Sequence, residues 1–223
     1  MPNLPPLSAL FTTAPSGNAT LFKRCLSAAV ADGVVSEIII SFNGCSADYV
    51  ADIKTWADHP CIRFLEFPEH KYLVHNVNAL VQAASYEHVV WLADDCEMYP
   101  GSLAHSRAVY AAAFPDDTGI VGIDIYDGKE KLCAFPLTSK TYLRSLYGEP
   151  CRLASEEYVQ RVWDSELADR ARESDSLRMG GAARHYREAG AAGNEIGYGP
   201  DSTKDLNTYY RRKANGWKDT EHG

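Results

Sequence analysis

The stretch that decides the fold is Val89-Val90-Trp91-Leu92-Ala93-Asp94-Asp95-Cys96-Glu97. Its first half is a short apolar run, which is typical of a buried strand, and its second half places three carboxylates within four residues. Carboxylates this close repel one another, and a hard divalent cation such as Mg²⁺ is a suitable partner because it prefers oxygen ligands. Ligands of open α/β sheets bind at the carboxyl ends of the strands. The stretch therefore predicts a strand with a metal-binding end or, alternatively, a turn whose acids cap the next helix.

Composition and charge limit the class of protein. A chain of 223 residues is long enough for one domain with a sizeable core. Its net charge of −8 disfavours a general nucleic-acid-binding protein but is compatible with a local basic patch. No apolar run approaches the ~18–20 residues of a membrane span, and the N-terminus has neither the basic nor the apolar region of a signal peptide. The six cysteines form no Cys-x-x-Cys pair, and we expect reduced thiols in a cytoplasmic protein.

Outward from the acidic stretch, the hydrophobic pattern alternates between strands and helices. Strands are predicted at 8–14, 34–42, 61–67, 89–93 and 119–126, and helices at 21–30, 47–57, 72–84 and 102–114. This alternation predicts a largely parallel sheet with helices on both faces. After residue 126 the pattern loosens into a strand at 132–136, helices at 140–147 and 155–174, a Gly- and Ala-rich stretch at 180–199, and a basic helix at 203–215.

Two familiar phosphate-binding motifs are absent from the chain. The turn after the first predicted strand, Ala14-Pro15-Ser16-Gly17, lacks the Gly-x-Gly-x-x-Gly of dinucleotide-binding folds, and no P-loop pattern occurs. A diphosphate could instead be held through a metal ion on acidic side chains. The end of the strand at 89–93 supplies such side chains.

Four parts of the sequence carry a resemblance to a known family. They are residues 10–15 with 21–26, residues 37–46, residues 78–84 with 89–95, and residues 163–170. In order and spacing they resemble, respectively, the first strand and helix, the second strand, the segment leading to the D-x-D site, and the acidic segment with the catalytic base of GT-A glycosyltransferases of the family 2 type. The resemblance covers residues 8–100 well and residues 155–216 loosely.

The resemblance implies an α/β fold of the GT-A (Rossmann-like) type. A mostly parallel central sheet flanked by helices would form a single domain over residues 1–223. Residues 8–126 would be the nucleotide-sugar-binding half, residues 127–202 the acceptor and catalytic half, and residues 203–223 a basic C-terminal helix and tail. The implied activity is metal-dependent, inverting transfer of a sugar from a nucleotide-diphosphate sugar donor to an acceptor hydroxyl.

The resemblance also assigns roles to individual residues. Asp95, Glu97 and His185 are the implied ligands of Mn²⁺ or Mg²⁺. Asp164, with Glu166 as its competitor, is the implied catalytic base that takes the proton of the acceptor hydroxyl. The implied donor-binding residues are Thr12, Thr13, Ala14, Phe42, Asn43, Asn78 and Asp94, the last through the ribose or the same metal ion.

Several of these residues have structural alternatives. Glu97 and Asp164 suit the caps of the helices that follow them, and a lone histidine is more often structural than a ligand. Phe42 and Asn43 stand where the family often has an acidic residue that reads the base; they could contact a base or simply make a turn. Ala93 replaces the first aspartate of the family's acidic tip.

The acceptor is open at this stage: a saccharide, a small molecule, or a hydroxymethylated DNA base, as in some phage glycosyltransferases. The DNA acceptor rests on Lys204, Arg211, Arg212 and Lys213, which lie among aromatic residues in the basic helix. The same charges could fold over donor phosphates or form a solvated helix face. The alternatives in function are a catalytically inactive nucleotide-sugar-binding protein of the same fold and a nucleotidyltransferase, which would need a Gly-rich basic loop after the first strand.

Overall fold

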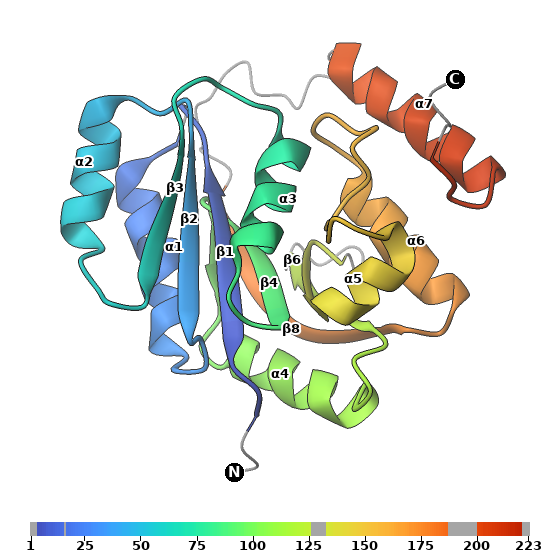
Figure 1. The fold of residues 1–223 in the computed structure, drawn as a ribbon. Coiled ribbons are helices and arrows are strands. Elements are labelled where there is room, and N and C mark those ends of the chain that lie inside the picture. The colour runs from blue at the N-terminus through green and yellow to red at the C-terminus, as the bar shows by residue number, and fades with distance from the viewer. Residues whose placement is uncertain (1–3, 16, 126–132, 187–199, 220–223) are drawn as a thin grey trace.

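The computed structural model describes residues 4–15, 17–125, 133–186 and 200–219. Eight strands form one sheet in the order β3-β2-β1-β4-β7-β6-β8-β5 (Figure 1). The strands are β1 (Leu7–Thr13), β2 (Glu37–Asn43), β3 (Ile62–Phe67), β4 (His88–Ala93), β5 (Cys96–Met98), β6 (Ile120–Ile125), β7 (Phe135–Ser139) and β8 (Leu177–His185). Only β7 and β5 run against their neighbours, so the mostly parallel α/β sheet predicted from the sequence is confirmed.

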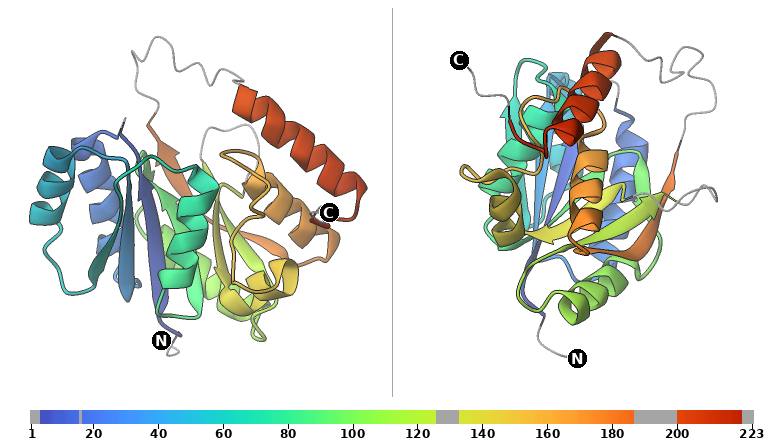
Figure 2. Two further views of the ribbon diagram at one scale, coloured as in Figure 1. Left: turned by 45° about the horizontal axis from the view of Figure 1, so that its top comes forward. Right: turned by 90° about the vertical axis from the view of Figure 1, so that its right-hand side faces the viewer.

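Helices cover the sheet and connect its strands. They are α1 (Ala19–Ala31), α2 (Ala47–Trp56), α3 (Leu73–Ala83), α4 (Ser102–Ala113), α5 (Lys140–Tyr147), α6 (Trp163–Glu173) and α7 (Pro200–Ala214). Figure 1 shows α1 and α2 on one side of strands β1–β3 and α3 on the other. The further views in Figure 2 show α7 lying beside α6, at the far end of the molecule from α2.

The strand with the acidic end lies at the centre of the sheet. Strand β4 pairs in parallel with β1, so that Ala93 lies opposite Thr12 and the acidic residues follow at the carboxyl edge. On its other side β4 pairs antiparallel with β7. The interiors of β1, β2 and β4 are almost fully buried, which explains why these strands read as continuous apolar runs.

Three elements of the later chain differ from the sequence prediction. The helix predicted over 155–174 begins only at Trp163, because residues 155–162 form turns and bends. Strand β7 covers 135–139 rather than 132–136, and residue 132 lies outside the described residues. The acids after β4 do not lead directly into a helix, since Cys96–Met98 forms the short strand β5.

The first two residues of the Gly- and Ala-rich stretch, 180–181, are part of strand β8. A Cβ atom on Gly181 would lie 2.6 Å from the carbonyl oxygen of Ser102, so only glycine lets α4 approach β8 this closely. The hydroxyl of Ser102 donates to the carbonyl of Ala182 (2.8 Å), and the Gly181 N–H donates to the hydroxyl of Ser106 (2.8 Å). The close packing holds β8, which ends at His185, firmly on the sheet.

All six cysteines carry free thiols, as the sequence predicts. Within the described part of the chain, no helix combines the length and apolar character that crossing a membrane requires.

We predict that Gly181→Val destabilises the fold. The added side chain meets backbone, which cannot move without shifting α4, and overpacking of this kind costs about 1–3 kcal/mol. Thermal unfolding should show a melting temperature lower by several degrees. Arg184→Val, at an exposed position of the same strand, is the control and should change stability by less than about 0.5 kcal/mol. Equal melting temperatures for the two variants would contradict the packing argument.

Candidate active site

The three carboxylates of the acidic stretch contact three different sets of partners. Asp94 faces β1: the hydroxyl of Thr13 and the backbone N–H of Ala14 donate to its carboxylate. Burial, together with the negative charge of Asp95, raises the pKa of Asp94 to about 6 despite these hydrogen bonds. Thr13 is itself hydrogen-bonded to the hydroxyl of Tyr49 (2.8 Å). The predicted donor residues Thr12, Thr13, Ala14 and Asp94 therefore lie together at the carboxyl edge of β1 and β4.

Asp95 contacts the end of β8. Its Oδ2 lies 3.0 Å from Nε2 of His185, a residue 90 positions away in the sequence, and its Oδ1 accepts a hydrogen bond from the thiol of Cys96 (3.2 Å). The Tyr186 N–H donates to the Asp95 carbonyl (2.9 Å), which fixes the pairing of the two segments. Although burial acts to raise it, these hydrogen bonds and the imidazole hold the pKa of Asp95 below its ordinary value.

The donor atoms at this point suit a divalent cation. Among the described residues, Asp95, Cys96 and His185 bring their ligand atoms within 4.8 Å of one another. Adjacent ligands of an octahedral cation at about 2.1 Å lie about 3 Å apart, which matches the distance between Oδ2 of Asp95 and Nε2 of His185. Hard cations such as Mg²⁺ and Mn²⁺ prefer oxygen ligands, whereas thiolate selects softer metals. We therefore assign oxygen and imidazole, and not sulfur, as the ligands that fit.

Glu97 does not join this cluster, contrary to the sequence expectation. Successive side chains of a strand point to opposite faces, and β5 directs Glu97 away from Cys96 and His185. The Glu97 carboxylate accepts the hydroxyl of Tyr186 and pairs with Arg24 at 2.9 Å. Although its slight burial acts to raise it, these partners hold the pKa of Glu97 below its ordinary value. Nor does Glu97 cap α4; Gly101 stands at that position.

Three predicted donor residues have structural roles in the described chain. The ring of Phe42 is buried and stacks on Phe64 (5.7 Å between centroids). The buried amide of Asn43 bonds both the carbonyl and the N–H of Lys71, and so holds the loop before α3. The buried amide of Asn78 bonds the backbone of residues 153–154. Because these side chains pack against or hydrogen-bond other parts of the protein, we leave them out of the donor site.

Asp164 lies in the first turn of α6. The preceding residue, Trp163, is buried against Trp91 of β4 with ring centroids 5.1 Å apart, and this contact ties the start of α6 to the central strand. The Asp164 carboxylate is only partly exposed and accepts the N–H of Ser165 (2.9 Å). Burial raises the pKa of Asp164. The N-cap position belongs to Val162, so Asp164 is not the cap.

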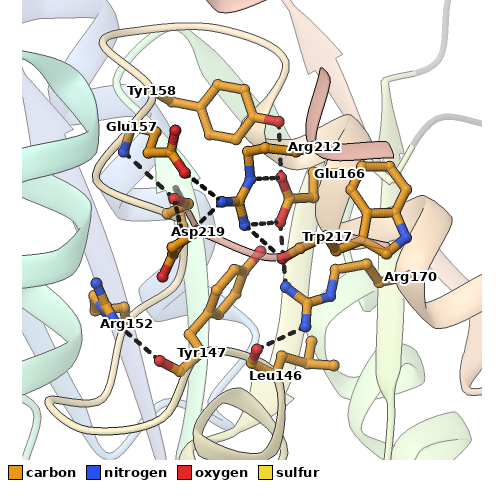
Figure 3. A network of polar contacts seen from close by, with 12 residues as sticks. Leu146, Tyr147, Arg152, Glu157, Tyr158, Glu166, Arg170, Arg212, Trp217 and Asp219 are labelled. Carbon is orange, nitrogen blue, oxygen red and sulfur yellow. Dashed lines mark hydrogen bonds and ion pairs between the residues drawn. The ribbon is translucent and has the colours of Figure 1, made fainter. Parts of the chain in front are cut away.

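Glu166 is fully buried and belongs to an ion-pair network (Figure 3). Arg212 of α7 donates to both carboxylate oxygens, through Nε at 2.7 Å and a terminal nitrogen at 2.9 Å. The hydroxyl of Tyr158 (2.7 Å) and the guanidinium of Arg170 (3.2 Å) complete its contacts. With its carboxylate occupied inside the protein, Glu166 is a poor candidate for proton transfer, and Asp164 is the better one.

Three charges of the basic helix pair with acidic side chains of the same chain. Arg211 and Arg212 pair with Glu157, and Lys213 pairs with Asp169 (2.6 Å). Although burial acts to lower it, the hydrogen bonds and charges of Glu166 and Asp219 raise the pKa of Arg212. The alternative of a solvated basic face is therefore wrong for Arg212, which is fully buried. Arg211 and Lys213 lie on an exposed face, where they pair with acidic side chains of the same chain.

Two features of this region were not found from the sequence. Cys96 is a hydrogen-bond donor to Asp95, whereas its spacing to the other cysteines gave no signal. Asp205 of α7 is fully buried and accepts hydrogen bonds from the backbone of residues 159–161. Asp205 is the one acid within the basic helix predicted over 203–215, which could have drawn attention to it, but nothing in the local sequence indicates its partner.

Comparison with known proteins finds a matching family model and a solved structure of similar fold. The model of the family described as glycosyl transferase family 2 matches residues 18–165, a span that contains the acidic stretch and ends one residue after Asp164. A solved structure of the mannosyltransferase PcManGT from Pyrobaculum calidifontis, in complex with GDP-Man and Mn2+, has a TM-score of 0.69 at 16% identity. The match covers 94% of this chain and 65% of that one, slightly less than two thirds of its length, and it shows a shared fold. Comparison with curated proteins gave no match.

We predict that the buried and exposed arginines of α7 differ sharply in their effect on stability. Arg212→Ala leaves the buried Glu166 without its main partner, and breaking such a pair costs about 3–5 kcal/mol. Arg211→Ala removes a surface pair and should cost at most about 1 kcal/mol. Urea unfolding of the two variants measures the difference. Similar losses in both would mean that the network in Figure 3 is not the main attachment of α7.

Proposed function

This chain belongs to glycosyl transferase family 2, and from that premise we propose that it transfers a sugar from a nucleoside-diphosphate sugar to an acceptor hydroxyl with a divalent cation at Asp95 and His185. The observation that carries the proposal is the contact between these two side chains. It joins the end of the central strand to the end of β8, at the edge of the sheet where ligands of α/β proteins bind.

The donor side of the proposed site is formed by β1 and β4. Thr12, Thr13 and Ala14 end β1 beside Asp94, and we propose that they surround the nucleoside of the donor. A nucleotide-sugar donor is supported by the similar mannosyltransferase, whose structure contains GDP-Man and Mn2+. Phe42 and Asn43 are outside this donor site, because Phe42 stacks on Phe64 and Asn43 bonds Lys71.

Asp95 and His185 would hold the cation, either Mn²⁺ or Mg²⁺. When bound, it supplies positive charge that stabilises the departing nucleoside diphosphate. The carboxylate of Asp95 is well prepared for this role, because its pKa is lowered and it stays ionised at neutral pH. His185 is kept in place by the pairing of β8 with β5, in which it lies opposite Cys96.

Asp164 is the proposed general base. The acceptor oxygen attacks the anomeric carbon as the bond to the diphosphate breaks, and Asp164 takes the proton of the acceptor hydroxyl. Its raised pKa makes it a stronger base than an exposed aspartate. One carboxylate is sufficient for a single displacement, and Glu166 is committed to Arg212, so we propose that the reaction inverts the anomeric configuration.

The acceptor is proposed to be a hydroxyl of a saccharide or a small molecule. A modified DNA base was suggested by the basic helix alone, and Arg211, Arg212 and Lys213 pair with acidic side chains of the same chain. With a net charge of −8, the chain offers little other attraction for a polyanion.

We predict that GDP or UDP raises the melting temperature only together with Mn²⁺ or Mg²⁺. A ligand that binds the folded state alone must stabilise it. Asp95→Asn should abolish the metal-dependent shift in melting temperature. Glu97→Gln, two residues further along the chain at a side chain that pairs with Arg24, should keep it. The measurement is thermal unfolding with Mn²⁺ or with EDTA. A metal-dependent shift that survives Asp95→Asn would place the cation elsewhere.

We also predict that Asp164→Asn lowers turnover at least a hundredfold while leaving nucleotide binding unchanged, since general-base catalysis contributes about 10²–10⁴-fold. Because burial raises the pKa of Asp164, kcat/KM of the native enzyme should fall as the pH drops through a value above that of an ordinary aspartate. Steady-state release of the nucleoside diphosphate measures both. Full turnover by Asp164→Asn would exclude it as the base, and nucleotide binding without any turnover in the native chain would indicate a binding protein.

A further inference from the structure

The backbone that leads into the proposed base has an unfavourable conformation. Val162, two residues before Asp164, has φ 53° and ψ 3°, in the left-handed region. This region is disfavoured for all residues with a Cβ atom and most of all for β-branched ones. A conformation of this kind persists only where the surrounding structure enforces it, and such positions cluster at functional sites.

One side chain of α7 holds the residues immediately before Val162. Asp205 is fully buried, and its Oδ1 accepts the N–H of Val159 at 2.8 Å. Its Oδ2 accepts the N–H groups of Gln160 and Arg161, both at 2.7 Å. These are charge-assisted hydrogen bonds, which are stronger than neutral ones. The orientation of three consecutive peptide groups is thus fixed by one carboxylate.

The same segment is held from its other side. The carbonyl of Val159 accepts the N–H of Val74 at the start of α3 (3.3 Å). Tyr158 donates to Glu166, and Glu157 pairs with Arg212, within the network of Figure 3. After Val162 the chain is fixed again by Trp163 against Trp91. The turn at Val162 therefore lies between two anchored points, and Asp205 is the side chain that bonds the backbone directly before it.

We propose that Asp205 is a positioning residue for the general base Asp164, an inference that rests on the function proposed above. Its carboxylate keeps residues 159–161 in place, which forces Val162 into the left-handed region and starts α6 at Trp163 with Asp164 in the first turn. Without this carboxylate, Val162 relaxes towards ordinary backbone geometry, and the first turn of α6 carries Asp164 away from the acceptor.

A second contact between the same helices provides a matched control. Lys213 of α7 pairs with Asp169 of α6 at 2.6 Å, and Asp169 also accepts the hydroxyl of Tyr209. Asp169 lies more than one turn after Asp164 in α6, and neither Lys213 nor Asp169 bonds any residue of 157–162 in the described contacts. Removing Lys213 weakens the docking of α7 without touching the turn at Val162.

The experiment compares native protein with Asp205→Asn, Lys213→Ala, and Asp205→Asn combined with Val162→Gly. The asparagine is nearly isosteric, but one of its two atoms becomes an N–H donor that faces backbone N–H groups. The readouts are the Kd of GDP or UDP with Mn²⁺, by calorimetry, and kcat for release of that diphosphate from its sugar nucleotide. Glycine reaches positive φ without the penalty of a Cβ atom, so Val162→Gly should restore the turn where Asp205 no longer enforces it.

We expect Asp205→Asn to lower kcat at least tenfold, while the Kd for the nucleoside diphosphate stays within twofold of the native value. Lys213→Ala should leave both within twofold, and adding Val162→Gly should raise kcat of Asp205→Asn at least threefold. Asp205→Glu, which retains the charge but is longer by one methylene, replaces Asp205→Asn if that variant does not fold, with the same expected loss.

Three results would overturn the role of Asp205. They are native kcat in Asp205→Asn, an equal loss in Lys213→Ala, and no gain from Val162→Gly. Failure of the proposed function gives a different result: the native chain then binds neither diphosphate with Mn²⁺ and releases none. In that case the role of Asp205 falls with the function on which it rests.

Discussion

Three carboxylates at the end of one buried strand impose the constraint on which the site depends. The structure separates them by direction: Asp94 turns to Thr13 and Ala14, Asp95 to His185, and Glu97 to Arg24 and Tyr186. Asp94 and Asp95 lie in the turn between β4 and β5, and Glu97 lies in β5. Strand β8 supplies His185, and Tyr186 follows directly after that strand. The antiparallel pairing of β5 with β8 therefore brings His185 next to Asp95, at the proposed metal site.

The second half of the chain holds the helix that carries the proposed base against the central strand. Trp163 packs on the central strand, and α7 fixes the segment before it through Asp205 and Arg212. A buried ion pair is a costly way to dock a helix, because both charges lose their hydration. The network around Glu166 offsets this cost by using both oxygens of that carboxylate and several donors of Arg212 (Figure 3). Helix α7, whose charges suggested a binding surface in the sequence, is attached to the rest of the protein by its buried residues Asp205 and Arg212.

Local patterns were sufficient for the parallel half of the fold and for the acidic end of β4. They failed where a role is decided by a partner distant in the sequence. Gly180–Gly181 has the composition of a loop, and only the approach of α4 shows why a strand needs glycine there. Arg212 has the same local pattern whether it is solvated or paired with Glu166, 46 residues away. Phe42 and Asn43 were expected at the donor site, but Phe42 stacks on Phe64 and Asn43 hydrogen-bonds the backbone of Lys71.

The central claim is that one divalent cation binds where the ends of β4 and β8 meet. Crystals grown with Mn²⁺ and GDP or UDP, measured at the manganese absorption edge, test it most directly, because anomalous scattering locates the ion without assumptions about ligands. We expect one strong peak within coordination distance of an Asp95 carboxylate oxygen and of His185 Nε2. A peak at Glu97, or a bound nucleotide with no peak at Asp95, would contradict it.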